Sequence, residues 1–241
     1  EEKGREPQYD GYVESFTENW EKLEQYDNNA PKTMNAHLHV LEAYTLLYQC
    51  WKDNGLKKRL EFCVDLFMNR IYDPSRKHFN LFFDNEWNSL VEMDSYGHDV
   101  ETGWLLCEAA RTLENQDLIE QTNQLALDVT EACLAEGMSD KGYMIYEKKG
   151  DRKTKHASWW GQIETVIACV NAWQISGSDV YLQSVDTVWT FVKDHMVDKE
   201  YGEWYSDCFD GEPKKEAPKV SMWRCPYHTV RLGVEMYNRL K

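Results

Sequence analysis

Apolar residues recur at three- and four-residue spacing along most of the chain, which is the period of amphipathic α-helices. Leu38, Leu41, Tyr44 and Leu47 form one such series. The pattern predicts seven helices, with expected bounds of 33–54, 56–72, 96–113, 118–136, 157–176, 180–197 and 224–240.

The predicted helices repeat as a unit of helix, helix and hairpin. The first helices of the units open 63, 61 and 67 residues apart, at Thr33, Tyr96, Ala157 and Arg224. Between the pairs, aromatic and polar residues alternate, with Gly or Asn-Glu near a turn. This pattern predicts short β-hairpins, which start near Tyr9, Lys77, Lys141 and Tyr201.

Helix pairs of this kind cannot bury both of their faces alone, so they stack into an open solenoid or a closed ring. We favour a closed, all-α toroid of helix hairpins, forming a single domain over residues 1–241. In such a ring the first helix of each pair lines the inside, and all inner helices point the same way. The opening turns of the inner helices should therefore meet at one end of the ring.

Composition limits the classes of function. A chain of 241 residues, of which 42% are hydrophobic, is long enough for one sizeable core. A net charge of −15 disfavours a phosphate-binding surface, so no nucleic-acid partner is predicted. Charges interrupt every apolar run, so no membrane span is predicted. The seven scattered cysteines form no CxxC or CxxH pair, which is typical of reduced, cytoplasmic thiols and gives a structural zinc no support.

Histidines are concentrated at the openings of the predicted inner helices. The openings read NAHLHVLE from Asn35, YGHDVE from Tyr96, WWGQIE from Trp159 and WRCPYH from Trp223. A histidine in a helix is ordinarily structural, but His39, His98 and His228 each open a different inner helix, and we favour a functional role for them. His37 lies about 200° from His39 around its helix, so we expect it to pack or to support the site.

Acidic and aromatic residues accompany these histidines. Glu101 and Glu164 lie among apolar residues, which favours inward placement, where a carboxylate needs a partner. We favour a functional role for Glu101, whereas Glu164 is equally well explained as a functional or an ordinary surface acid. Trp159, Trp160 and Trp223 either fill the core or stack on the C–H faces of a sugar.

Cofactor and metal motifs are missing from the sequence. His37, His39 and Glu42 imitate metal ligands, but residues two positions apart point to different helix faces, and no HExxH is present. A P-loop, a GxGxxG and a GxSxG elbow are absent as well. The sequence therefore predicts no metal and no cofactor.

Five stretches of the sequence resemble one known family. They are KTMNAHLHVLEAY from Lys32, SYGHDVETGWLL from Ser95, WWGQIETV from Trp159, NAWQISGSDVYL from Asn171 and VSMWRCPYH from Val220. In this order they resemble the N-acylglucosamine 2-epimerase superfamily and, within it, the cellobiose 2-epimerases. The similarity extends over the chain from about Tyr9 and implies an (α/α)6 barrel.

The resemblance implies cofactor-independent inversion at C2 of the reducing-end glucose of a cellobiose-type β-1,4 disaccharide. His98 and His228 resemble the acid/base catalysts of the family. His39 and Glu101 resemble the groups that support ring opening and polarise the open-chain carbonyl. The expected substrate contacts are Asn35, Trp159, Trp160, Glu164 and Trp223.

These residue types suit that reaction. The C2 proton becomes removable only after the ring opens and C1 is an aldehyde, because the carbanion must delocalise onto oxygen as an enediolate. Imidazole titrates near neutral pH, so it can both take and return the proton. Two histidines on different faces of the planar intermediate would permit inversion without a redox cofactor.

The chain departs from the family in length. A ring of six pairs needs about twelve helices, whereas the sequence predicts seven. We therefore expect the C-terminal part of a longer protein, with the missing N-terminal helices or a partner surface covering an open apolar edge. Three alternatives stay open: a monosaccharide N-acylglucosamine 2-epimerase or mannose isomerase, a non-catalytic sugar-binding remnant, and a glycoside hydrolase using Glu101 and Glu164.

Overall fold

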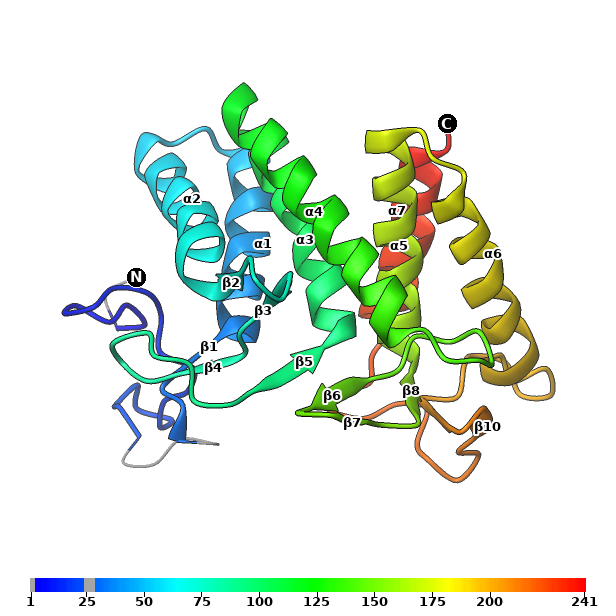
Figure 1. The fold of residues 1–241 in the computed structure, drawn as a ribbon. Helices are drawn as coiled ribbons and strands as arrows, with labels where there is room; N and C mark the ends of the chain where they lie inside the picture. The colour runs from blue at the N-terminus through cyan, green and yellow to red at the C-terminus, as the bar shows by residue number, and fades with distance from the viewer. Residues whose placement is uncertain (1–2, 24–28) are drawn as a thin grey trace. The chain divides into compact units, whose positions relative to one another are not determined.

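The computed structural model describes residues 3–23 and 29–241, and the described residues form seven α-helices joined by short strands (Figure 1). The predicted all-α class is confirmed. The helices are α1 (Met34–Cys50), α2 (Asn54–Leu66), α3 (Tyr96–Leu113), α4 (Gln116–Gly137), α5 (Trp159–Ser176), α6 (Val180–Phe191) and α7 (Tyr227–Arg239).

The chain divides into two compact units. Unit 1 comprises Glu1–Asp94 and Leu105–Thr122, and unit 2 comprises Ser95–Trp104 and Asn123–Lys241. Helices α3 and α4 contribute residues to both units. The prediction of a single domain stays a prediction, and each unit is described by itself.

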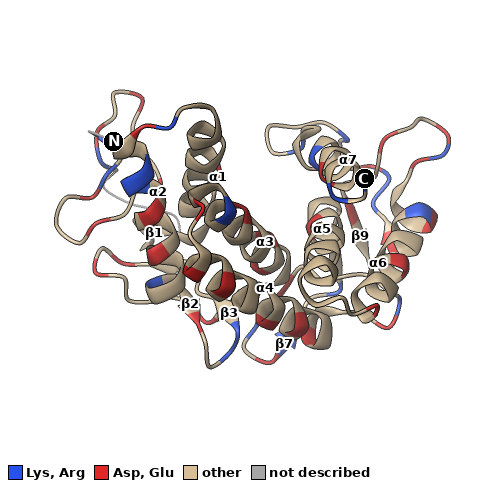
Figure 2. Ribbon diagram, turned by 90° about the horizontal axis from the view of Figure 1, so that it is seen from above, with Lys and Arg blue, Asp and Glu red and all other residues tan. Residues whose placement is uncertain are grey.

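In unit 1, side-chain caps set where the first two helices begin. The Oγ1 of Thr33 accepts a hydrogen bond from the N–H of Ala36 at 3.1 Å, and Asp53 accepts one from Leu56 at 2.9 Å. Helices α1 and α2 lie side by side in both ribbon views (Figures 1 and 2). The apolar faces that they bury include Leu38, Leu41, Leu60, Cys63 and Phe67.

One short hairpin and one pair of strands distant in the sequence complete unit 1. Strand β1 (Lys32–Thr33) pairs with β4 (Phe82–Phe83), and β2 (Tyr72–Asp73) pairs with β3 (His78–Phe79), both antiparallel. The hairpin of β2 and β3 begins at Tyr72, before the one predicted to start near Lys77, and Lys77 lies at its turn with a positive φ of 61°. Strand β5 (Met93–Ser95) leads into α3.

His37 is buried in unit 1 and has the packing role expected from its position. Its Nδ1 donates a hydrogen bond to the carbonyl oxygen of Thr33 at 2.6 Å, and its Nε2 accepts one from the N–H of Tyr12 at 2.8 Å. Burial lowers the pKa of His37 to about 4. The neutral imidazole therefore fastens the segment before α1 onto that helix.

Unit 2 is built around α5. Ser158 caps this helix by accepting a hydrogen bond from Gly161, and Gly177 ends it with a positive φ of 72°. Every residue of Gly161–Ala172 is buried, because α6 and α7 pack against α5 (Figures 1 and 2). A helix that is buried on all sides is typical of the centre of a core.

Strands lie beneath the helix openings of unit 2. Strand β9 (Asp207–Phe209) pairs with both β8 (His156–Ser158) and β10 (Glu212–Pro213), and β6 (Glu147–Lys149) pairs with β7 (Arg152–Lys153). Because β8 runs directly into α5, the strand holds the first turn of that helix in place. The predicted hairpins at Lys141 and Tyr201 are thus confirmed a few residues further along.

Four helix boundaries differ from the prediction by three residues or more. Helix α1 ends at Cys50 and not near residue 54. Helices α2 and α6 end in π-helical turns, Phe67–Ile71 and Val192–Met196, instead of continuing as α-helix. Helix α7 begins at Tyr227 and not at Arg224, because Pro226 suits the start of a helix and not its interior.

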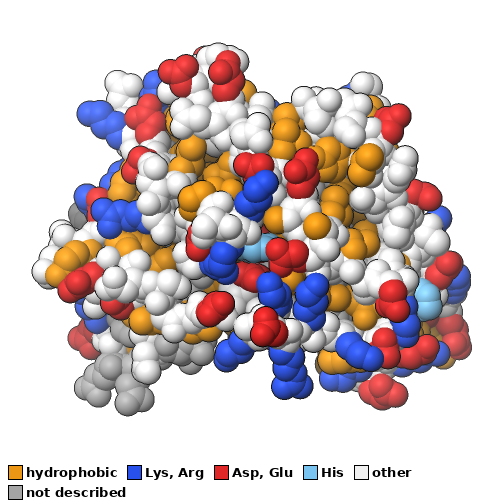
Figure 3. Space-filling model, in the orientation of Figure 1, with side chains coloured by type: hydrophobic (Ala, Val, Ile, Leu, Met, Phe, Trp, Pro, Cys, Tyr) orange, Lys and Arg blue, Asp and Glu red, His pale blue; other side chains and the backbone are white. Residues whose placement is uncertain are grey.

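Acidic and basic side chains are interspersed over the face in Figure 3, with apolar side chains between them. Among residues 3–23 and 29–241, no helix combines the length and apolarity needed to cross a membrane.

Candidate active site

The first turn of α3 holds His98 beside a tryptophan of α5. The Nδ1 of His98 shares a hydrogen bond of 2.7 Å with the hydroxyl of Ser95, and its ring centroid lies 4.6 Å from that of Trp160. A Cβ on Gly97 would lie 2.7 Å from Cζ3 of Trp160. The glycine of the GHD sequence is therefore required for the close approach of the indole.

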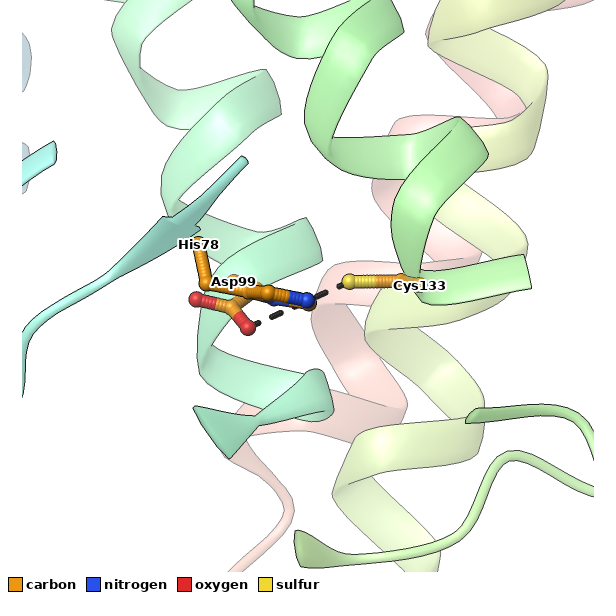
Figure 4. A group of neighbouring side chains, drawn as sticks. All are labelled: His78, Asp99 and Cys133. Atoms are coloured by element: carbon orange, nitrogen blue, oxygen red, sulfur yellow. Dashed lines mark hydrogen bonds between the residues drawn. The ribbon is translucent and has the colours of Figure 1, made fainter. Parts of the chain in front are cut away.

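The opposite face of this turn anchors it to α4. Asp99 is fully buried, and Cys133 of α4 donates from Sγ to its Oδ2 at 4.0 Å and to the carbonyl oxygen of Tyr96 at the same distance (Figure 4). These contacts fix the turn from which His98 projects toward Trp160.

His228, in the first turn of α7, pairs with a buried carboxylate of α5. Its Nδ1 lies 2.7 Å from Oε1 of Glu164, whose side chain is 0% exposed. Because a carboxylate only accepts hydrogen bonds, Nδ1 carries the proton in this pair, and the neutral ring keeps its lone pair on Nε2. The geometry is that of a general base oriented by an acid.

Trp160 lies against both histidines. Its ring stacks on His228 with centroids 5.7 Å apart and an interplanar angle of 30°, in addition to its contact with His98. Trp159 meets His228 edge-on, with centroids 6.2 Å apart. The two imidazoles thus come from helices far apart in the sequence and share one indole. The contact between Trp160 and a sugar stays a prediction.

Arg231, one turn beyond His228, joins two buried glutamates. Its Nη1 donates to Oε1 of Glu101 at 2.6 Å and to Oε1 of Glu164 at 3.1 Å. Glu164 also accepts a hydrogen bond from the indole of Trp104 at 2.9 Å. The guanidinium lies over the ring of Tyr227, 4.2 Å from its centroid. One cation therefore offsets part of the cost of burying two carboxylates.

Glu101, Glu164 and His228 each offer one potential metal-ligand atom within 4.8 Å of the others. The chemistry of these donors does not suit a cation, however. Arg231 already supplies positive charge to both carboxylates, and the Nδ1 of His228 donates to Glu164 rather than presenting a lone pair. Their arrangement is explained by hydrogen bonding within the protein.

Sequence reasoning identified both glutamates but missed Arg231. Two buried acids required a cationic partner, and the sequence places an arginine one helical turn after His228. An arginine at this spacing on the same helix is the sequence signal from which Arg231 could have been predicted. The sequence also provides no signal for Trp104, whose N–H donates to Glu164.

The remaining predicted site residues are more exposed. Trp223 lies in unit 2 just before α7 and is 81% exposed. Asn35 and His39 lie on α1 in unit 1, where His39 pairs with Glu42 at 3.3 Å and its side chain is 45% exposed. The convergence of these two α1 residues with the histidines of unit 2 stays a prediction.

Residues 1–231 match the model of the N-acylglucosamine 2-epimerase (GlcNAc 2-epimerase) family. The chain belongs to this family. Among its relatives, the cellobiose 2-epimerase of Bacteroides fragilis is 40% identical over 94% of this chain and 59% of the relative. The cellobiose 2-epimerase of Dictyoglomus turgidum is 36% identical over 95% of this chain and 60% of the relative.

Solved structures of the 2-epimerase family share the fold of this chain. A sugar epimerase from a ruminal bacterium superposes with a TM-score of 0.93 at 34% identity, over 99% of this chain and 62% of that one. A D-mannose isomerase has a TM-score of 0.77 at 18% identity, which bears on the fold alone. These neighbours are (α/α)6 barrels, as the predicted fold class requires. The chain spans about 60% of the length of the curated relatives it matches.

Proposed function

We propose that this chain carries the acid/base machinery of a carbohydrate 2-epimerase that acts on the reducing-end glucose of a cellobiose-type disaccharide. The observation that carries the proposal is the hydrogen bond between His228 and Glu164. His98 lies against the same indole, that of Trp160, as His228 does. Membership of the 2-epimerase family supports the reaction class, and the names of the relatives support the disaccharide.

In the proposed reaction the sugar ring first opens, and C1 becomes an aldehyde. Nε2 of one histidine then takes the proton from C2, and the electron pair moves onto the C1 oxygen to give an enediolate. The other histidine returns a proton to the opposite face of C2, which inverts that carbon. The second imidazole must be protonated for this step, so the two rings exchange their protonation states over one turnover.

Glu164 and Arg231 have separate tasks in this scheme. Glu164 holds the tautomer of His228 and stabilises its imidazolium when the proton arrives. Arg231 donates hydrogen bonds to both Glu164 and Glu101 and balances their charge. Glu101 and His39 are proposed to assist ring opening, and Asn35, Trp159, Trp160 and Trp223 to contact the sugar.

The carboxylate pair argues against a glycoside hydrolase. A hydrolase needs its two acids to flank the bond that is cleaved. Here the side chains of Glu101 and Glu164 are 2% and 0% exposed, and both accept hydrogen bonds from Arg231. Buried carboxylates that accept hydrogen bonds from an arginine are better suited to orient neighbouring side chains than to act on a glycosidic bond.

We also propose that α7 packs against further helices in the complete protein. Tyr227, Val230, Val234 and Tyr237 follow three- and four-residue spacing and are 38%, 59%, 50% and 70% exposed. Such a stripe is typical of a helix that packs against another helix. The relatives exceed this chain in length, which supports helices of the same protein as the occupant.

Proton NMR in D2O tests the reaction. Cellobiose, mannose and N-acetylmannosamine are incubated with the chain alone, and with the chain supplemented by the part of a relative that it does not match. Deuterium at C2 of cellobiose, together with a mannose-type anomeric signal, is the expected result. His98→Asn and His228→Asn should each abolish the exchange and leave sugar binding largely intact.

Each other result has a distinct meaning. Exchange into mannose or N-acetylmannosamine alone would favour the monosaccharide epimerase or isomerase. Exchange only with the supplement would support the need for further helices. No exchange under either condition would contradict the proposal and favour a sugar-binding protein.

A further inference from the structure

The loop before α7 is fastened at two points to a single hairpin. The hairpin is Asp198–Trp204, closed by a bridge between Val197 and Trp204 and by a hydrogen bond of 2.9 Å from the N–H of Asp198 to the carbonyl oxygen of Glu203. Lys219 and Arg224 both dock on it. We call the four residues between them, Val220–Trp223, the tip.

Lys219 makes the first attachment. Its Nζ donates to Oδ2 of Asp198 and, at 2.7 Å, to the carbonyl oxygen of Gly202. The ammonium also lies 5.3 Å from the ring centroid of Tyr205. The hydrogen bond from Lys219 holds the pKa of the Asp198 carboxyl well below its usual range. The charged pair is therefore maintained over the whole neutral pH range.

Arg224 makes the second attachment and is 2% exposed. Its Nη2 donates to the carbonyl oxygen of Trp204 at 2.8 Å and pairs with Oε1 of Glu203 at 3.0 Å. The guanidinium lies over Trp159, 4.6 Å from the ring centroid, and Trp159 in turn meets His228. This attachment thus connects the loop to the catalytic histidine through one indole.

Stability alone does not explain a buried arginine at this position. The Nε and Nη1 atoms of Arg224 are buried without a hydrogen-bond partner among the described residues. Unsatisfied buried donors carry a free-energy cost, and an apolar side chain of similar length would avoid it. Groups of this kind call for a reason other than packing.

The tip between the attachments is apolar and exposed, yet its backbone is ordered. Val220, Met222 and Trp223 are 75%, 83% and 81% exposed. Ser221 and Arg224 exchange backbone hydrogen bonds of 3.0 and 3.2 Å, which closes the turn that carries Met222 and Trp223. Apolar side chains exposed to water on a closed turn are suited to contact a ligand.

We propose that Lys219 and Arg224 are positioning residues, which clamp the tip to the hairpin so that its apolar side chains contact the part of the sugar remote from C2. The inference rests on the proposed function for the identity of the ligand. Neither cation touches the reacting atoms. Their effect is to fix where the sugar lies, with Arg224 also fixing Trp159 against His228.

Three variants test the clamp. Arg224→Met and Lys219→Met each remove one attachment, and Lys215→Met removes an exposed lysine of the same loop as the control. Chymotrypsin cleavage after Met222 or Trp223 should accelerate by about 10-fold or more in the first two variants and stay unchanged in the control, because proteolysis reports local opening. The urea midpoint of Arg224→Met should equal or exceed that of the unmodified protein.

The kinetics of C2 exchange test whether the tip contacts the sugar. They are measured with the chain alone or with the supplemented chain, whichever shows exchange. In both clamp variants, KM for cellobiose should rise by up to about 10-fold, the size expected from losing one aromatic contact. KM for mannose should change less, and the pH profile of kcat should shift only in Arg224→Met. A purely structural role would lower kcat for both sugars equally.

The failures can be told apart. Equal cleavage of all four proteins would overturn the clamp. Faster cleavage with unchanged KM for cellobiose would overturn the contact with the sugar. If even the unmodified protein exchanges no sugar, the proposed function fails together with the identity of the ligand, while the cleavage result still decides the clamp.

Discussion

Arg231 donates from a single nitrogen to Glu101, 2.6 Å away, across a separation of 130 residues in the sequence. The same Nη1 lies 3.1 Å from Glu164, so α7 neutralises acids from both α3 and α5. The pairing explains how unit 2 keeps two carboxylates side by side in its interior, and it joins the stability of the unit to the orientation of His228.

Replacing Arg231 with methionine should destabilise unit 2 by about 3–5 kcal/mol near pH 7, because both buried carboxylates lose their cation. Urea unfolding followed by near-UV circular dichroism measures the change. The double variant Glu101→Gln with Arg231→Met should recover part of the loss. A single variant as stable as the unmodified protein would contradict this account.

Glu164→Gln should lower C2 exchange by about 10³-fold or more. The amide can donate to Nδ1 of His228, which would move the lone pair away from Nε2 and leave the ring in the wrong tautomer. The measurement is deuterium incorporation at C2 under single-turnover conditions. Glu131→Gln, at an exposed acid of unit 2 that accepts a hydrogen bond from Tyr181, is the control. Equal losses in the two variants would refute the orienting role.

Gly97→Ala should displace Trp160, because the new Cβ would lie 2.7 and 2.8 Å from two atoms of the indole and 3.1 Å from the Cα of Gly161. We expect loss of exchange activity and a changed near-UV spectrum. Gly103→Ala, in the same helix, is the matched control, since its Cβ would meet Ala126 at an ordinary 3.5 Å. That substitution should stabilise α3 by up to about 1 kcal/mol. Similar behaviour of the two variants would show that Trp160 is not held as described.

His37 should make unit 1 less stable in mild acid. Its folded pKa of about 4 lies below the ordinary value of 6.5, so the unfolded chain binds the proton first as the pH falls. The stabilisation is complete above about pH 6.5 and falls by about 3 kcal/mol as the pH approaches 4. The free energy of unfolding of His37→Gln should lack this decrease between pH 6.5 and 4, and that of His39→Gln should retain it. Parallel pH curves for His37→Gln and the unmodified protein would contradict the assignment.

Local patterns made the helices predictable. The apolar period, the cap residues Thr33, Asp53 and Ser158, and Gly177 past the end of α5 agree with one another, and six helices start within two residues of expectation. The π-helical turns were not predictable in this way, because they depend on how the ends of α2 and α6 pack and not on a local signal.

The candidate site likewise contains residues that local patterns reveal and residues that depend on the tertiary fold. His98, His228, Glu101 and Glu164 could be proposed from the sequence because polar residues at helix openings depart from the apolar pattern around them. Arg231 was missed because its partners are 67 and 130 residues away and the pairing depends on the tertiary fold. The placement of His39 and Asn35 relative to these residues is likewise a tertiary property that no local pattern supplies.

The complete burial of Gly161–Ala172 has a consequence for how this protein tolerates mutation. Twelve consecutive positions admit few substitutions without a cavity or a clash, and Glu164 is among them. The exposed tip, in contrast, can change its side chains at little cost to the fold. Substitutions that the fold tolerates should therefore accumulate in the tip and be rare in the buried segment of α5 that holds Glu164.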